Sequence, residues 1–341
     1  MNSLSAANTR FAFDLFQQFK TSKKGDNIFF SPLSISSALA MTYLGAKENT
    51  ALEIGKVEKM ENVHHQFQKL LTELKKPTDA YELNMANKFY GEKKYQFLQE
   101  YMDNIKKFYL ASVESVDFNN AAEESRKKIN SWVESQTNGR VERLPIKITF
   151  FESLLCVKSV LDSIWCQWGG GDGFAESLEE SIADDGMVQV KVNKHNREFL
   201  YSLFPLLQLE DQLTAENLIE WTSSQNMSNG QVDLYLPRFK VEESYELKAT
   251  LKALGMVDAF NTKRANFSGM TGRQDLVVSK VRHKSFVEVT EEGTEAAAST
   301  DVEVIAKSAP IYPFHCDHPF LFFIKHNKTN SILFLGRVSS P

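Results

Sequence analysis

The hydrophobic pattern of this 341-residue chain changes from a helical period to a strand period along its length. In the first 140 residues, apolar side chains recur three and four positions apart, which predicts amphipathic helices over 63–76, 97–113 and 121–137. The last third holds short β-branched or aromatic runs between polar turns, which are typical of strands. These runs are 232–239, 276–281, 285–289, 320–324 and 332–335. Helices followed by strands predict an α+β fold with large, mostly antiparallel sheets.

Residues 27–46 carry clear signals for one buried helix. Ser31 is a good helix cap, and Pro32 suits the first helical position, where a missing N–H costs little. Gly45 predicts a left-handed stop. The residues between are small and apolar on nearly every side, so the core should surround this helix. The last two strand runs are joined by a polar turn, and we expect them to form a hairpin that is buried on both faces.

Composition limits the classes of function. With 42% apolar and 24% charged residues, the chain has enough material for a packed core. Its net charge of −5 gives no reason to expect a nucleic acid or a membrane as partner. Three cysteines argue against a disulfide framework and fit a reducing compartment. The first residues lack a signal-like apolar run, and no stretch is long enough to span a bilayer. We therefore expect a cytoplasmic protein, with release by an unconventional route left open.

The stretch 294–304 has the period of a strand with one buried face. One alternate set is small or β-branched throughout, whereas the other is polar or charged except for Ala297. Such a strand can slide between two neighbours at little steric cost, and Gly293 offers a backbone hinge just before it. The string 295–298 is also a strong helix former, so an exposed helix or linker explains the pattern equally well. The small set is Thr294, Ala296, Ala298, Thr300, Val302 and Val304.

Several motifs in order carry a resemblance to one known family. The run 291–300 is similar to a family hinge motif, and 316–323 with 334–337 is similar to its C-terminal signature. The chain resembles the serpins, and among them the intracellular, ovalbumin-like branch close to the squamous cell carcinoma antigens. The resemblance covers about 1–140 and 210–341. It is also carried by 27–46, 236–240 and 267–270.

The resemblance implies one serpin domain over 1–341, with helices around large sheets and an exposed reactive-centre loop. In this family a protease cleaves the loop to the acyl-enzyme stage, and the freed loop then inserts as a new central strand, which traps the protease. Counting 17 residues from Glu291 places the cleaved bond between Lys307 and Ser308. Ser34 and His283 match the family's shutter beneath the central sheet. The implied hinge residues are Glu291, Glu292, Gly293, Thr294, Glu295, Ala296, Ala297 and Ala298.

A lysine before the cleaved bond indicates the target class. Lys307 suits a serine protease whose specificity pocket holds a buried aspartate, which is the trypsin arrangement. Some members of this branch act on cysteine proteases, so that class stays open. We expect a monomer that acts as a suicide inhibitor of a trypsin-like serine protease.

The segment 141–210 departs from the family pattern. A serpin should have a long central strand here, and only 154–160 and, loosely, Gln167–Trp168 resemble it. Three interpretations stay open. The segment is a gene-model or splice artefact, or the chain is a non-inhibitory serpin with a binding or regulatory role whose loop is only a substrate, or a diverged segment still forms the strand.

Nothing in the sequence points to an enzyme. The Gly-X-Ser-X-Gly nucleophile setting is missing from the sequence, and 169–173 lacks the Lys-Ser/Thr of a phosphate loop. His64 and His65 are adjacent, which is the wrong spacing for two metal ligands on one helix face. Residues 315–318 look ligand-like, but their place in the C-terminal signature favours a strand. We expect no cofactor and no metal.

Overall fold

The computed structural model describes most of the chain but not the segments that carry the predicted hinge and reactive bond. Much of the divergent segment 141–210 also lies outside the described residues. The described ranges are 3–58, 63–76, 85–136, 156–161, 210, 213–221, 232–289, 312–326 and 328–341.

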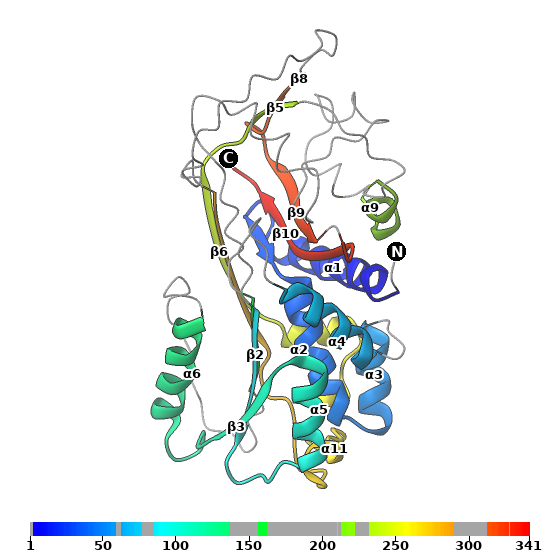
Figure 1. The fold of residues 1–341 in the computed structure, drawn as a ribbon, viewed down its shortest axis with the longest axis vertical. Helices are drawn as coiled ribbons and strands as arrows, with labels where there is room; N and C mark the ends of the chain where they lie inside the picture. Colours follow the sequence, from blue (N-terminus) through cyan, green and yellow to red (C-terminus); the bar gives the residue numbers. More distant parts are fainter. Residues whose placement is uncertain are drawn as a thin grey trace.

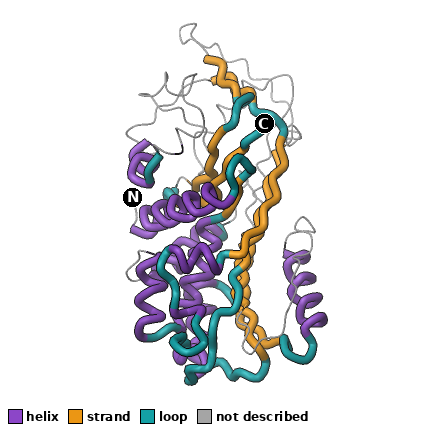
Figure 2. The backbone as a smooth tube through the Cα atoms, turned by 180° about the vertical axis from the view of Figure 1, so that it is seen from behind, coloured by secondary structure: helices purple, strands orange, loops and turns teal. Residues whose placement is uncertain are grey.

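Helices make up most of the described residues in the first half, as predicted. They gather beside a long band of strands, and α6 lies on the other side of that band from α2–α5 (Figures 1 and 2). The long helices are α1 (Ser3–Ser22), α2 (Pro32–Gly45), α3 (Glu48–Glu58), α4 (Val63–Leu74), α5 (Gln99–Tyr109) and α6 (Ala122–Gln136). The shorter ones are α9 (Ala215–Trp221), α10 (Lys248–Ala253), the 3-10 helix η1 (Asp258–Phe260) and α11 (Ser268–Thr271).

The described strands form four groups. A three-stranded group has the order β3-β2-β4, in which β2 runs parallel to β3 and antiparallel to β4. A second has the order β1-β10-β9 and is antiparallel throughout. The remaining strands form the antiparallel pair β6-β7 and the parallel pair β5-β8. In chain order these are β1 (Ile28–Phe30), β2 (Met85–Glu92), β3 (Ser112–Val116), β4 (Cys156–Leu161), β5 (Val232–Tyr235), β6 (Phe239–Glu246), β7 (Arg282–Val289), β8 (Tyr312–His315), β9 (Phe320–His326) and β10 (Ser331–Val338).

Helix α2 occupies the middle of the core, as its apolar sequence predicts. Twelve of its fourteen residues are buried. Ser31 caps it, because its side-chain oxygen accepts a hydrogen bond from the backbone N–H of Ser34, and Pro32 takes the first turn. Helices α1, α3, α4 and α5 and strands β4 and β10 all pack around it. The local signals were therefore sufficient to place this helix.

The predicted role of Gly45 was wrong. The helix does end there, but Gly45 does not have a left-handed backbone, and the following Ala46 is extended. A Cβ at Gly45 would lie 2.1 Å from Cγ of Met270 and 3.1 Å from a ring carbon of Tyr101. Close packing of α11 and α5 against the helix end, rather than turn geometry, therefore requires the missing side chain.

Two strand predictions also need correction. The run 232–239 is broken at 236–238, where Pro237 lacks the N–H that a continuous ladder needs, so that β5 and β6 pair with different partners. The run 276–281 forms no strand. Its first three residues are buried, and the N–H of Val278 donates one hydrogen bond to the carbonyl of Ala259 at 2.9 Å. Strand β10 is buried along its whole length, whereas most of β9 is half-buried.

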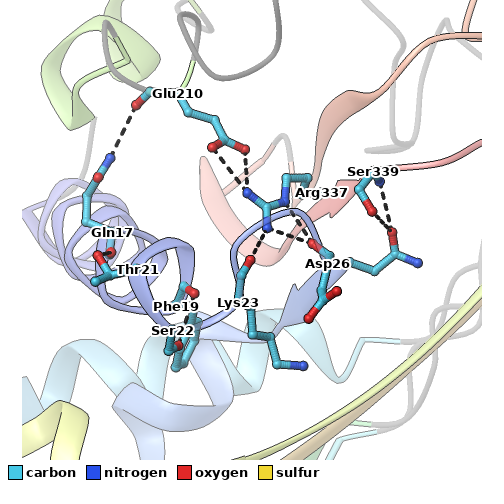
Figure 3. A network of polar contacts seen from close by, with 10 residues as sticks. Gln17, Phe19, Thr21, Ser22, Lys23, Asp26, Glu210, Arg337 and Ser339 are labelled. Atoms are coloured by element: carbon cyan, nitrogen blue, oxygen red, sulfur yellow. Dashed lines mark hydrogen bonds and ion pairs between the residues drawn. The ribbon is translucent and has the colours of Figure 1, made fainter.

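Arg337 on β10 joins the end of the divergent segment to the core (Figure 3). Its Nη1 contacts both carboxylate oxygens of Glu210, at 3.0 and 3.2 Å, and both side chains are buried. Its remaining donors reach the carbonyls of Lys23, at 2.5 Å, and Asp26, at 2.7 and 3.0 Å. Gln17 of α1 donates to the carbonyl of Glu210. One buried cation thus holds together α1, the turn that follows it, β10 and Glu210.

Candidate functional site

The candidate site is the interval between strands β4 and β7, which belong to two different sheets. Strand β4 is an outer strand of the β3-β2-β4 group, and β7 is paired with β6. These two strands are neighbours in space, yet within the described residues they share no ladder of hydrogen bonds. Helix α2 lies against β4. The edges of β4 and β7 are therefore two strand edges that a further strand can join.

The predicted reactive segment begins where β7 ends. Strand β7 ends at Val289, and β8 begins at Tyr312 in a different sheet. The eight predicted hinge residues at 291–298, together with Lys307 and Ser308, lie between these strands and outside the described residues. The described fold thus fixes both ends of the segment and connects the hinge directly to one edge of the interval.

The predicted shutter histidine is a buried residue of β7. His283 is 5% exposed, and its Nε2 accepts a hydrogen bond from the backbone N–H of Ser31 at 2.9 Å. Burial lowers the pKa of His283 to about 3, so the ring is neutral at pH 7. A neutral ring that accepts at Nε2 carries its proton on Nδ1. His283 therefore joins β7 to the turn between β1 and α2.

Ser34 takes part in the same junction through its backbone. Its N–H donates to Oγ of Ser31 at 3.1 Å, and Oγ of Ser31 donates to the carbonyl of Leu333 on β10 at 2.7 Å. Ser34 itself is buried in the first turn of α2. The structure thus brings the predicted pair Ser34 and His283 to one place, with Ser31 between them.

Two further side chains complete the junction, and sequence reasoning missed both. Ser285 Oγ donates to the carbonyl of Phe29 at 2.5 Å, and the hydroxyl of Tyr245 accepts from the N–H of Phe29 at 3.2 Å. Ser285 and His283 are two positions apart and so share one face of β7, and Tyr245 is the cross-strand neighbour of His283. The period-two pattern of β7 could have indicated Ser285, whereas Tyr245 needed the strand pairing.

Comparison with known proteins decides the family. The profile of the serpin (serine protease inhibitor) family matches residues 6–161 and 194–341. This chain belongs to the serpin family. Serpins inhibit proteases and are not themselves enzymes, as expected for this chain. The match includes 141–161 and 194–210, which flank the part of the divergent segment that it leaves out.

Individual serpins confirm the branch. The chain is 52% identical to Serpin B3 of Homo sapiens and 40% identical to the leukocyte elastase inhibitor of Homo sapiens, with 100% of each chain covered in both comparisons. The crystal structure of uncleaved ovalbumin is 34% identical, with a TM-score of 0.83 and full coverage of both chains. The predicted serpin fold and the predicted place in the ovalbumin-like branch, near the squamous cell carcinoma antigens, are confirmed.

This serpin is shorter than the alignment that it shares with its relatives. The alignment with Serpin B3 runs over 394 positions, so at least 53 of them hold no residue of this 341-residue chain. The family profile leaves out 162–193. Immediately before this gap, β4 (Cys156–Leu161) pairs with β2 from Met85 to Tyr90. A strand therefore exists close to where 154–160 predicted one, but it has only six described residues and lies at the edge of its described group.

His64 and Cys316, which lie outside the interval, are packed against neighbouring side chains and show no sign of a separate site. His64 Nδ1 lies 2.6 Å from the hydroxyl of Tyr109, and its ring stacks on Tyr43. Burial and the neighbouring His65 lower the pKa of His64 to about 4. Burial and the neighbouring Asp317 raise the pKa of the half-buried thiol of Cys316. Among the described residues, no three potential ligands gather around a metal position, and no helix is both long and apolar enough to cross a membrane.

Proposed function

We propose that this serpin inhibits a trypsin-like serine protease by presenting Lys307–Ser308 for cleavage and then inserting its hinge between β4 and β7. The observation that carries the proposal is the continuity of β7 with the predicted hinge, beside a second strand edge on β4. A strand that enters there can pair on both sides. The small side chains at Thr294, Ala296 and Ala298 would face α2 at little steric cost.

The energetics favour insertion once the loop is cut. Roughly ten new backbone hydrogen bonds would form, each contributing about 0.5–1.5 kcal/mol. Burial of the alternating apolar face adds to this. An intact loop is held at both ends by β7 and β8, which lie in different sheets, so cleavage is what releases it. Insertion must outrun hydrolysis of the acyl bond for the protease to be trapped.

Lys307 carries the proposed specificity. Its ammonium would enter the specificity pocket of a trypsin-like protease and pair with the buried aspartate there. We therefore expect inhibition of proteases that cleave after Lys or Arg, with the serpin acting as a cytoplasmic monomer. A cysteine protease that accepts lysine at this position is the other class to include among the targets tested.

The specificity is tested with a panel of trypsin, chymotrypsin, elastase and a papain-like protease. Cut positions are mapped by mass spectrometry for the wild type and for Lys307→Ala. The proposal expects trypsin to cut the wild type after Lys307 and to be inhibited, and Lys307→Ala to lose this inhibition. Lys280→Ala, near β7 but outside the loop, should behave as wild type. Trypsin inhibition that survives in Lys307→Ala, or a first cut elsewhere, would contradict the assigned bond.

One observation favours a second candidate, a non-inhibitory serpin whose loop is cleaved as an ordinary substrate. The described part of β4 spans six residues and β7 spans eight, in a chain that lacks at least 53 aligned positions of Serpin B3. An inserting strand would then have less edge to pair with on the β4 side. The thermal midpoint before and after loop cleavage separates the two. A large rise indicates insertion, and an unchanged midpoint indicates a substrate.

A further inference from the structure

Tyr245 is a buried residue beside the predicted shutter histidine, and the sequence did not single it out. It is 6% exposed and lies on β6, directly opposite His283 on β7. Its ring stacks on Phe19 of α1, with centroids 4.2 Å apart and planes 26° apart, and also lies parallel to the imidazole of His283 at 6.3 Å. The ammonium of Lys23 lies 5.0 Å from the ring centroid. One side chain thus contacts α1, β7 and the turn after α1.

The hydroxyl of Tyr245 adds a contact with β1. That strand is an outer strand of the β1-β10-β9 group, so one side of its backbone faces β10 and the other needs different partners. Side chains of β6 and β7 supply them: Tyr245 and Ser285 bond the N–H and carbonyl of Phe29, and His283 bonds the N–H of Ser31. Two hydrogen bonds therefore fasten the β6-β7 pair to β1, and a third fastens it to Ser31, the residue after β1.

We propose that Tyr245 is a positioning residue that holds β7 in fixed register on α1 and β1. Its ring sets the position of β6 against α1, and its hydroxyl locks that position by satisfying the N–H of Phe29. Strand β7 follows because all eight of its residues pair with β6, from Phe239–Val289 to Glu246–Arg282. One edge of the interval is then fixed before any new strand arrives.

The consequence for inhibition rests on the proposed function. An entering strand must align with β7 and β4 at once, so a β7 edge that shifts in register or position slows the first pairings. Slower insertion gives the acyl bond more time to hydrolyse, and more inhibitor molecules are consumed for each protease that is trapped. Tyr245 would thereby influence the balance between inhibitor and substrate behaviour without touching the protease.

Tyr245→Phe is the test variant, because it keeps the ring and its stacking but removes the acceptor for the N–H of Phe29. The chain offers a matched control in Tyr101, which is also buried and whose hydroxyl makes one backbone hydrogen bond, to the carbonyl of Met41 on α2. Tyr101→Phe therefore removes one buried hydroxyl between α5 and α2, away from β6 and β7. A second test variant, Ser285→Ala, removes the other of the two bonds to Phe29 of β1.

Native-state hydrogen exchange on the uncleaved protein decides the proposal. In Tyr245→Phe and Ser285→Ala, the amides of β6, β7 and Ser31 should exchange roughly fivefold faster than in wild type, while those of β2 stay unchanged. Tyr101→Phe should leave the β6 and β7 amides at wild-type rates. Two results would overturn the proposal: unchanged exchange in β6 and β7 of Tyr245→Phe, or equal acceleration in the β6-β7 pair and in β2.

Inhibition supplies the second readout. The number of serpin molecules consumed per trypsin molecule should rise at least about twofold in Tyr245→Phe and stay at the wild-type value in Tyr101→Phe, at similar thermal midpoints. An equal rise in both variants would mean that lost stability, not positioning, is responsible, and would also overturn the proposal. If wild type traps no protease, the proposed function fails. The exchange pattern still tests Tyr245, since it needs no protease.

Discussion

The imidazole of His283 accepts a hydrogen bond from the backbone N–H of Ser31 and can do so only while its Nε2 carries no proton. The two atoms are 2.9 Å apart, and the ring is 5% exposed. Burial lowers the pKa of His283 to about 3, against an ordinary value of 6.5. The joint between β7 and α2 is therefore built around a neutral histidine.

The buried neutral His283 at this junction predicts that the fold is less stable in acid. Between about pH 6.5 and pH 3 the unfolded chain binds a proton at His283 that the folded chain does not, so the free energy of unfolding falls as the pH falls. The stabilisation from the neutral His283 is fully present above about pH 6.5. His64, with a pKa of about 4, contributes with the same sign. Denaturant unfolding of wild type at about pH 7.5 and about pH 4.5 should show the loss.

His283→Gln should reduce this pH dependence, because a glutamine oxygen can still accept from Ser31 but does not titrate in this range. Ser285→Ala is the control, since it removes a neighbouring hydrogen bond on the same face of β7 without removing a titratable group. It should leave the difference between the two pH values unchanged. Equal pH dependence in wild type and His283→Gln would show that this ring is not the group responsible.

The buried ion pair of Arg337 and Glu210 predicts a large loss of stability when only one partner is removed. Glu210→Gln leaves the guanidinium buried without its counter-charge, at a cost of about 3–5 kcal/mol in the free energy of unfolding. The exposed pair of Arg10 and Glu216 is the comparison, and Glu216→Gln should cost less than about 1 kcal/mol. Urea unfolding of both variants checks the contrast. Equal small losses would show that Glu210 does not hold Arg337 in solution.

Gly269 of α11, which packs on the end of α2, and Gly55 of α3 should respond in opposite directions to an added methyl group. A Cβ at Gly269 would lie 2.8 Å from the carbonyl oxygen of Gly45, which is backbone and cannot easily move, so Gly269→Ala should destabilise the fold by about 1–3 kcal/mol. Gly55 lies inside α3, and its nearest neighbour would be 3.6 Å away. Gly55→Ala should stabilise by about 0.5–1 kcal/mol. Thermal midpoints that move in the same direction would contradict the packing argument.

The alternation at 294–304 predicts that one face of the hinge is sensitive to charge. Thr294→Arg would place a charged side chain on the face that inserts toward α2, and should raise the number of serpin molecules consumed per trypsin about tenfold or more. Ser299→Arg places the same charge on the opposite face and should change it little. Titration of trypsin activity measures both. Equal effects would mean that the strand does not enter with the proposed register.

Local signals in the sequence predicted the helices well because their causes are local. Ser31 and Pro32 fix the start of α2 through their own backbone chemistry, and the apolar surface of α2 places it in the core. The resemblance to serpins supplied Ser34 and His283, and the structure brings them together. The predicted hinge and reactive bond remain predictions, since they lie outside the described residues.

The errors and omissions came from contacts between distant parts of the chain. Gly45 looked like a turn residue, but the atoms that require it belong to Met270 and Tyr101. Residues 276–281 have the composition of a strand, yet the backbone N–H of Val278 donates to the carbonyl of Ala259 rather than to a neighbouring strand. Tyr245 carries no sequence signal, because its importance depends on pairing with β7 and on Phe29, more than two hundred residues earlier.

The most direct test of loop insertion is to mix purified wild-type protein with trypsin and to look for a complex that survives boiling in denaturant. The account predicts a covalent band at the summed mass of the two proteins, with the serpin cut after Lys307, because the loop inserts before the acyl bond hydrolyses. The same cut with no covalent band, and with trypsin left active, would contradict it. The loop would then be a substrate beside a sheet that does not take it up.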